Sequence, residues 1–239
     1  EMTVQVLRAK LDEAETRAEM GKFLTRVLTG TCLYMFALSA TMPLSALVED
    51  TAMVTVPILI AFAIALYVNI KTSIFPASAY GFTLNGWRPA VREAVVFSVP
   101  VAAVIVLFKF ILVHTVPDMM GAPVFELSRS EDSVTVVVSA IAYAVSAPVQ
   151  EMVARSGMQS SFMMFLTSRH KVWWSIFLST FLFSSIHLHV SVILAVLVFP
   201  FGLFWGWLYA RRPTLVGVSL SHVAIGLFAL YVVGIPGYQ

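Results

Sequence analysis

The chain alternates long apolar stretches with short polar ones, a pattern that predicts an all-α membrane protein. A helix needs roughly 20 mostly apolar residues to cross a bilayer. The fourth stretch is too long for one simple crossing, so we expect a break near Pro148 or an end that emerges into water. The fifth is short and is expected to end inside the bundle. We predict about seven spans, at residues 23–44, 51–70, 92–113, 134–168, 172–188, 190–210 and 214–234.

Residues 1–22 differ from the rest because charged side chains surround a narrow apolar seam. The seam has the 3-4-3-4-3 spacing of a coiled coil, and its positions are Val4, Leu7, Leu11, Ala14, Ala18 and Gly21. Fewer than three heptads are marginal for assembly, so two interpretations stay open. The segment is either a solvated cytosolic helix leading into the first span, or a connector to an upstream domain or a dimer partner. Residues 23–239 are predicted to form the membrane domain.

Composition supports a membrane protein and excludes several functions. Hydrophobic residues make up 59% of the chain and charged residues only 12%, with a mean hydropathy of +0.88. A soluble domain of this size carries roughly 25% charged residues. The net charge of +2 gives no reason to expect nucleic acid as a partner. The single cysteine, Cys32, excludes an internal disulfide framework and a thiolate metal cluster.

Basic and acidic loops alternate along the chain, which predicts its orientation. Loops rich in Lys and Arg remain in the cytosol, and this rule predicts a cytosolic N-terminus and a C-terminus on the other side. The basic positions are Arg8, Lys10, Arg17, Lys22, Arg26, Lys71, Arg88, Arg92, Arg169, Lys171, Arg211 and Arg212. The intervening loops carry Glu49, Asp50, Asp118, Glu126, Glu131 and Asp132, with Arg129 alone opposing them.

Four ionisable side chains remain inside the predicted spans: Glu151, Arg155, His187 and His222. A charge at mid-membrane costs roughly 2.5–3.5 kcal/mol on insertion scales. The i, i+4 spacing of Glu151 and Arg155 predicts that they share a helix face and pair, which would be a sufficient structural explanation. Lys109 lies nearer a helix end and is expected to reach the interface.

The two histidines favour a functional site over simple pairing. Glu151 with Arg155, His187 and His222 lie on three separate spans at roughly similar depth, so one buried polar cavity explains them better. A buried carboxylate and an imidazole can activate a water, and a second imidazole can stabilise an oxyanion. A metal site made of Glu151, His187, His189 and His222 stays open on residue type alone. We predict no cofactor.

These residues resemble the CPBP family, the CAAX-protease and bacteriocin-processing (Abi) membrane proteins. The family motifs E-E-x-x-x-R, F-x-x-x-H and H-x-x-x-N read here as Gln150-Glu151-x-x-x-Arg155, Phe183-x-x-x-His187 and His222-x-x-x-Gly226. The resemblance covers roughly residues 75–230. It implies a helical bundle with an intramembrane catalytic cavity and glutamate-type proteolysis. By position, Glu151 is the second glutamate and Arg155 its partner, His187 joins in activating water, and His222 contributes to the oxyanion site.

Two departures from the family motifs affect the chemistry. The first glutamate is the family's usual general base, and Gln150 cannot accept a proton. Gly226 replaces an asparagine and removes an amide donor. Glu151 has taken over as the base, or the chain is a natural pseudoprotease, or Gln150 is an introduced substitution.

The leading hypothesis is an intramembrane peptidase that cleaves a membrane-anchored or lipidated, CAAX-like substrate with a Glu/His-activated water. The alternative is a non-catalytic membrane sensor or binding protein, regulated through an upstream cytosolic domain. A transporter or proton relay is a third option, although no inverted repeat supports it. Membrane lipid is the expected surrounding in each case.

Overall fold

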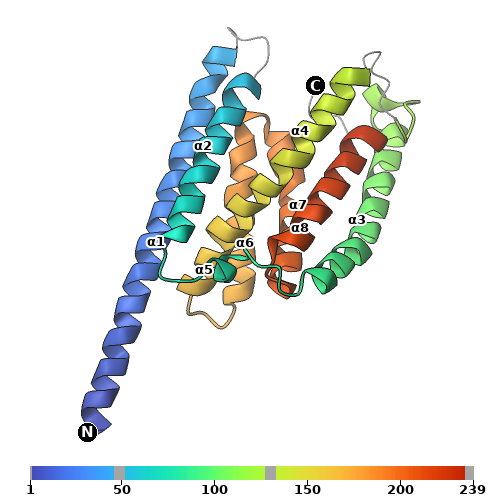
Figure 1. Cartoon of the computed structure of the whole chain (residues 1–239). Coiled ribbons are helices and arrows are strands. Elements are labelled where there is room, and N and C mark those ends of the chain that lie inside the picture. The colour runs from blue at the N-terminus through green and yellow to red at the C-terminus, as the bar shows by residue number, and fades with distance from the viewer. Residues whose placement is uncertain (1, 46–51, 127–132, 235–239) are drawn as a thin grey trace. The chain divides into compact units, whose positions relative to one another are not determined.

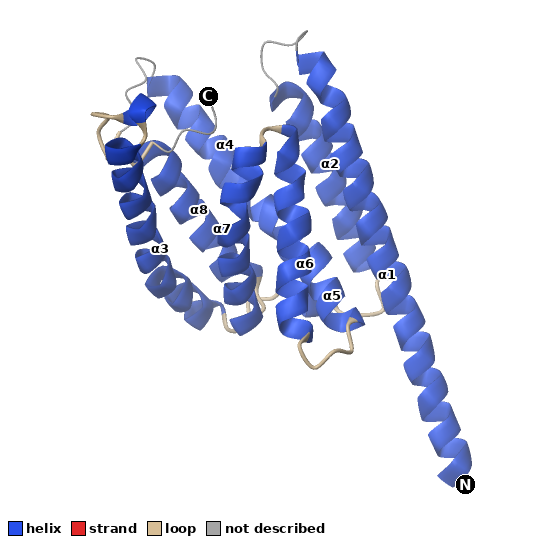
Figure 2. Cartoon of the chain, turned by 180° about the vertical axis from the view of Figure 1, so that it is seen from behind, coloured by secondary structure: helices blue, strands red, loops and turns tan. Residues whose placement is uncertain are grey.

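A computed structural model describes residues 2–45, 52–126 and 133–234 of the chain, and this part contains helices and no strand (Figures 1 and 2). The all-α prediction is therefore confirmed. The α-helices are α1 (Met2–Ser45), α2 (Ala52–Lys71), α3 (Trp87–Thr115), α4 (Ser133–Glu151), α5 (Ser160–Phe165), α6 (Lys171–Ile186), α7 (Val192–Arg211) and α8 (Leu215–Leu227). Short 3-10 helices are η1 (Ala77–Tyr80), η2 (Pro117–Met119) and η4 (His187–His189). Two π-helices, η3 (Met152–Gln159) and η5 (Phe228–Val232), follow α4 and α8 directly.

Five described helical stretches are long and apolar enough to cross a membrane: Asp12–Ala40, Trp87–Thr115, Val136–Phe165, Val192–Arg211 and Leu215–Val232. The described apolar part of α2, Val56–Lys71, is shorter, and α6 has only 16 residues. The protein is thus a polytopic helical membrane protein. Five of the seven predicted spans meet the length criterion within the described residues.

Helix α1 joins the predicted connector to the first span without a break (Figure 1). Residues 12–18 are exposed, and the first buried side chains are Phe23 and Leu24. The apolar face therefore begins close to residue 23, where the sequence predicts the membrane domain to begin. The seam positions Val4, Leu7 and Leu11 have side chains outside the described set, as do the acidic positions in 46–51 and 127–132.

The helices group into two compact units. Unit 1 comprises residues 1–82 and 152–206, and unit 2 comprises residues 83–151 and 207–239. The core of unit 1 joins α1 and α2 to the later helices of the unit. Tyr80 is fully buried there, with its hydroxyl 2.5 Å from Ser73 Oγ and its ring 4.8 Å from that of Phe23. The other core residues are Leu24, Val27, Leu38, Leu66, Ile70, Val153, Met158, Phe162 and Ile186.

The fourth predicted span contains an irregularity of a different kind from the one expected. The helix continues through Pro148 and changes to π geometry at Met152. Pro148 has no N–H for the carbonyl four residues earlier, which weakens the regular pattern locally. In the π-helix, Gly157 lies against α2, where an added Cβ would be 2.9 Å from Leu66 Cδ2. Single-turn π segments are rare and are often found at functional sites.

Unit 2 is organised around α8, which packs against both α3 and α4. Thr214 caps the start of α8 by accepting a hydrogen bond from Val216 N, and its hydroxyl donates to Thr83 O at 2.8 Å. Gly217 allows close approach to α3, because a Cβ there would be 2.7 Å from Ala90 O. The start of α8 is thus held close to α3 and to Thr83, and His222 lies further along the same helix.

Lys109 on α3 does not reach the interface, contrary to expectation. Its side chain is 1% exposed. The ammonium donates to Glu126 Oε1 at 3.1 Å and to Gly234 O at 2.7 Å. An ammonium surrounded by hydrocarbon would have no hydrogen-bond acceptor. Here a carboxylate and a carbonyl of the protein accept its hydrogen bonds, in place of the water that it would have met at the membrane interface.

Candidate active site

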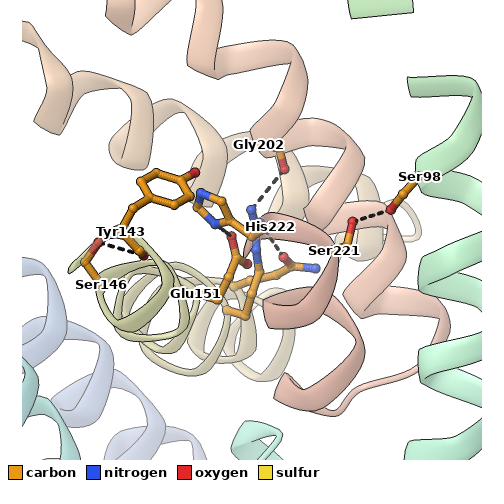
Figure 3. Close-up of polar contacts among 9 residues, drawn as sticks. Ser98, Tyr143, Ser146, Glu151, Gly202, Ser221 and His222 are labelled. Atoms are coloured by element: carbon orange, nitrogen blue, oxygen red, sulfur yellow. Dashed lines mark hydrogen bonds and ion pairs between the residues drawn. The ribbon is translucent and has the colours of Figure 1, made fainter. Parts of the chain in front are cut away.

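Glu151 and His222 meet inside unit 2. Glu151 is the last residue of α4 and has no exposed surface, and His222 lies in the middle of α8 with 4% exposed. His222 Nδ1 and Glu151 Oε1 are 2.7 Å apart (Figure 3). The structure therefore brings together two of the ionisable residues that the sequence singled out, from segments 71 positions apart.

The pair has a defined direction of hydrogen bonding when the glutamate is ionised. A carboxylate can only accept, so Nδ1–H of His222 is the donor. In the neutral imidazole, the lone pair then resides on Nε2. This arrangement fixes the orientation of the imidazole ring.

Tyr143 lies next to this pair, and the sequence analysis missed it. Tyr143 is on α4, eight positions before Glu151, and its ring centroid is 6.1 Å from that of His222 at an interplanar angle of 72°. A Cβ added to Gly226 would overlap the Tyr143 hydroxyl and the adjoining ring atoms. The tyrosine therefore occupies the space of the missing side chain at 226. The available signal was spacing, because positions eight apart share a helix face.

Arg155 is completely buried in unit 1 and is held by α7. Its Nη1 donates to Gln159 Oε1 at 2.9 Å, and its Nη2 donates to Gly202 O at 3.0 Å. Gln159 Nε2 donates to Gly206 O at 2.8 Å. A Cβ on Gly206 would be 2.8 Å from Arg155 Nη1, so only glycine leaves room for the guanidinium. Gly202 and Gly206 on α7 thus leave room for the polar side chains of η3, whereas pairing of Arg155 with Glu151 stays a prediction.

His187 lies at the C-terminal end of α6 and begins the 3-10 helix η4. It is half-buried in unit 1, and its Nδ1 is 2.9 Å from Phe183 O. The Phe183 ring packs edge-on against the imidazole with centroids 5.0 Å apart. The prediction that these two residues of the second motif share a helix face is confirmed by this contact. If Nδ1 carries the proton, this carbonyl accepts it and leaves the lone pair on Nε2.

Gln150 is half-buried on α4 and directly precedes Glu151. The neutral amide can donate and accept hydrogen bonds but cannot act as a base near neutral pH. With Gln150 in place of the glutamate of the family motif, the residue directly before Glu151 cannot accept a proton.

A pocket of about 270 Å³ opens in unit 2 between α3 and α8. Its polar lining residues are Ser98 and Ser221, whose hydroxyls are 2.8 Å apart and so satisfy each other (Figure 3). Glu151 and His222 do not line it. The predicted polar cavity around the pair stays a prediction. Among the described residues, no group of three or more His, Cys, Asp or Glu side chains could hold a metal ion.

Comparison with known proteins supports the resemblance drawn from the motifs. Residues 132–228 match the family model of type II CAAX prenyl endopeptidase Rce1-like proteins. The match contains all three motifs and is shorter than the predicted range of 75–230. No curated protein and no solved structure matches the chain. The family match covers less than half of the chain, and over residues 132–228 it confirms the resemblance to CPBP proteins.

Proposed function

We propose that this chain is an intramembrane peptidase whose catalytic centre contains Glu151 and His222. The observation that carries the proposal is the 2.7 Å hydrogen bond between two buried titratable side chains from α4 and α8. Burying a carboxylate and an imidazole is costly. A packing role would be filled at lower cost by apolar residues, so a chemical role accounts for their presence.

The family resemblance assigns His222 to the oxyanion site, whereas its contact with Glu151 favours a role as the base, and we propose the latter. In the proposed reaction, Nε2 of His222 takes a proton from a water molecule as the water oxygen attacks the carbonyl carbon of the scissile peptide bond. The electron pair of the carbonyl moves to its oxygen and forms a tetrahedral oxyanion. Glu151 accepts the Nδ1–H bond throughout and stabilises the imidazolium. The C–N bond then breaks, and the imidazolium returns the proton to the leaving nitrogen. The products are a carboxylic acid and an amine.

The remaining motif residues are assigned by the family resemblance. A carboxylate at position 150 could take up the water proton, which the amide of Gln150 cannot do, so we propose that Gln150 leaves this chain a slow enzyme. His187 is assigned to water activation and Arg155 to holding the carboxylate. The anchoring of Arg155 by the Gly202 carbonyl supports a fixed orientation for its guanidinium.

The substrate class follows from the family and from the surroundings of the pair. We propose a membrane-anchored or lipidated peptide that ends in a CAAX-like sequence, because Rce1-like proteins are described as CAAX prenyl endopeptidases. A lipid anchor would concentrate such a peptide at the depth of helices that cross the bilayer. We further propose that the N-terminal part of α1 is cytosolic and links the domain to an upstream domain or a second copy.

The test is hydrolysis of a farnesylated fluorescent peptide by the full chain in liposomes. The parent should cleave slowly. Because Gln150→Glu restores the carboxylate, it should raise kcat by about 10²–10⁴-fold. His222→Ala should lower kcat by a comparable factor in both backgrounds. His114→Ala is the matched control, since His114 is exposed on α3 and its Nδ1 is bonded to Phe110 O in its own helix.

Absence of cleavage by both the parent and Gln150→Glu, with both folded in the membrane, would overturn the peptidase. If both variants also retained binding of the peptide, the chain would be a membrane receptor for lipidated peptides. Equal loss in the His222→Ala and His114→Ala variants would show that general destabilisation, rather than chemistry, causes the effect.

A further inference from the structure

The space beside His222 is filled from an unexpected direction. Gly226 is one turn after His222 on α8, so a side chain at 226 would share a face with the imidazole. That position is buried, and the Tyr143 hydroxyl from α4 occupies the place where the side chain would begin. The glycine thus lets a polar group from α4 lie next to the imidazole.

Three contacts keep Tyr143 in this place. Its ring packs edge-on against His222, its hydroxyl end lies over Gly226, and the backbone of α4 holds it two turns from Glu151. Figure 3 shows the ring of Tyr143 beside the His222 imidazole, and the imidazole in turn meets Glu151. One acid, one imidazole and one phenol therefore converge within unit 2.

A phenol differs from the other two groups because it is a neutral donor that keeps its proton near neutral pH. Such a donor stabilises a developing negative charge without competing with the base for the water proton. Donors fixed before the reaction are most effective in buried sites, where little water competes with them. In the proposed reaction, Glu151 accepts the Nδ1–H bond of His222, and Nε2 of His222 takes the water proton, so neither side chain donates to the oxyanion at the moment of attack.

From this geometry we infer that Tyr143 is a catalytic residue, whose hydroxyl donates a hydrogen bond to the carbonyl oxygen of the scissile bond as it becomes an oxyanion. The inference rests on the proposed peptidase function and adds a donor to it. The hydroxyl keeps its proton, so the bonds made and broken in the reaction are unchanged. Gly226 is then a requirement of the site, because any side chain there would displace the phenol.

The experiment uses the farnesylated fluorescent peptide with the full chain in liposomes, in the Gln150→Glu background. Tyr143→Phe keeps the ring and removes only the donor. We expect kcat to fall by about 10²–10³-fold, with KM unchanged within about twofold. A phosphinic peptide that mimics the tetrahedral intermediate should bind weaker by a similar factor. Tyr231→Phe is the matched control, because it removes another α4-facing hydroxyl, bonded to Ser139 Oγ at 2.9 Å.

A second set of variants separates chemistry from packing. Tyr143→Ala empties the space over Gly226, and adding Gly226→Asn then supplies an amide donor from α8. The Tyr143→Ala/Gly226→Asn variant should have a kcat at least tenfold higher than that of Tyr143→Ala. The Tyr143→Ala/Gly226→Leu variant has a side chain of similar shape without a donor and should recover none.

The outcomes distinguish this inference from the proposed function. In the Gln150→Glu background, equal cleavage rates of the Tyr143→Phe and Tyr231→Phe variants would overturn the role of Tyr143. The proposed peptidase function would be unaffected by that result. Equal rescue by Asn and Leu would assign Tyr143 to packing alone. Absence of cleavage by Gln150→Glu would overturn both.

Discussion

Unit 2 buries Lys109 and Glu151, and the partners of these two side chains differ in kind. Lys109 donates hydrogen bonds to a carboxylate and to a backbone carbonyl, and both of these groups act only as acceptors. Glu151 is bonded to an imidazole, whose second ring nitrogen can accept a proton. The Lys109 group is therefore suited to holding one structure, and the Glu151 group to a step in which a proton moves. The chemistry of the partner is thus a better guide to a proposed site than burial of charge alone.

The largest expected effect breaks the chemical pair. Glu151→Gln in the Gln150→Glu background retains the shape and an acceptor for Nδ1–H but removes the charge that stabilises the imidazolium. We expect kcat for the fluorescent peptide to fall about 10²–10⁴-fold, while the thermal midpoint changes little. Retention of kcat together with a large loss of stability would make Glu151 a structural residue of the same kind as Lys109.

The next effect breaks the structural group. Glu126→Ala leaves the buried ammonium of Lys109 with the Gly234 carbonyl but without its carboxylate, and because the Glu126 side chain is 37% exposed we expect a loss of about 1–2 kcal/mol. Unfolding in mixed micelles measures this loss, and kcat per folded molecule should change less than twofold. Asp118→Ala is the control, since it removes an exposed acid from the short helix that follows α3. Equal stability of the two variants would contradict the structural role.

The smallest effect isolates crowding at the same group. Gly234 has φ +65°, and a Cβ there would be 2.8 Å from Glu126 Cβ. Gly121 has φ +82° with open space around it. Both alanine variants carry the strain of a positive φ, about 1–2 kcal/mol, and Gly234→Ala should cost roughly 1 kcal/mol more because Glu126 must shift. If the thermal unfolding midpoints of the two variants coincided, Glu126 would be free to move. The packing around Lys109 and Glu126 would then be looser than their contacts indicate.

Hydrophobicity was enough to predict a helical membrane protein, and the motifs singled out Glu151 and His222, which the structure brings into contact. They could not predict partners, because a partner depends on how each helix is rotated about its own axis. The i, i+4 argument assumed regular α geometry after Glu151, and the chain instead enters a π-helix at Met152. The Lys109 prediction failed because a carboxylate 17 positions away supplies what water would have supplied. In the sequence, Gly226 indicated only the loss of an amide donor. The structure shows that Tyr143, 83 positions earlier in the chain, occupies the space of the missing side chain.

Helix α1 has a mechanical consequence. Its 44 residues span about 66 Å at 1.5 Å per residue, against about 30 Å for the hydrocarbon layer. More than half of this rod must therefore project beyond the hydrocarbon, with no joint to absorb motion. Because the helix is continuous, a change in the direction of its projecting part would be passed along it to Phe23 and Leu24, where its described side chains first become buried.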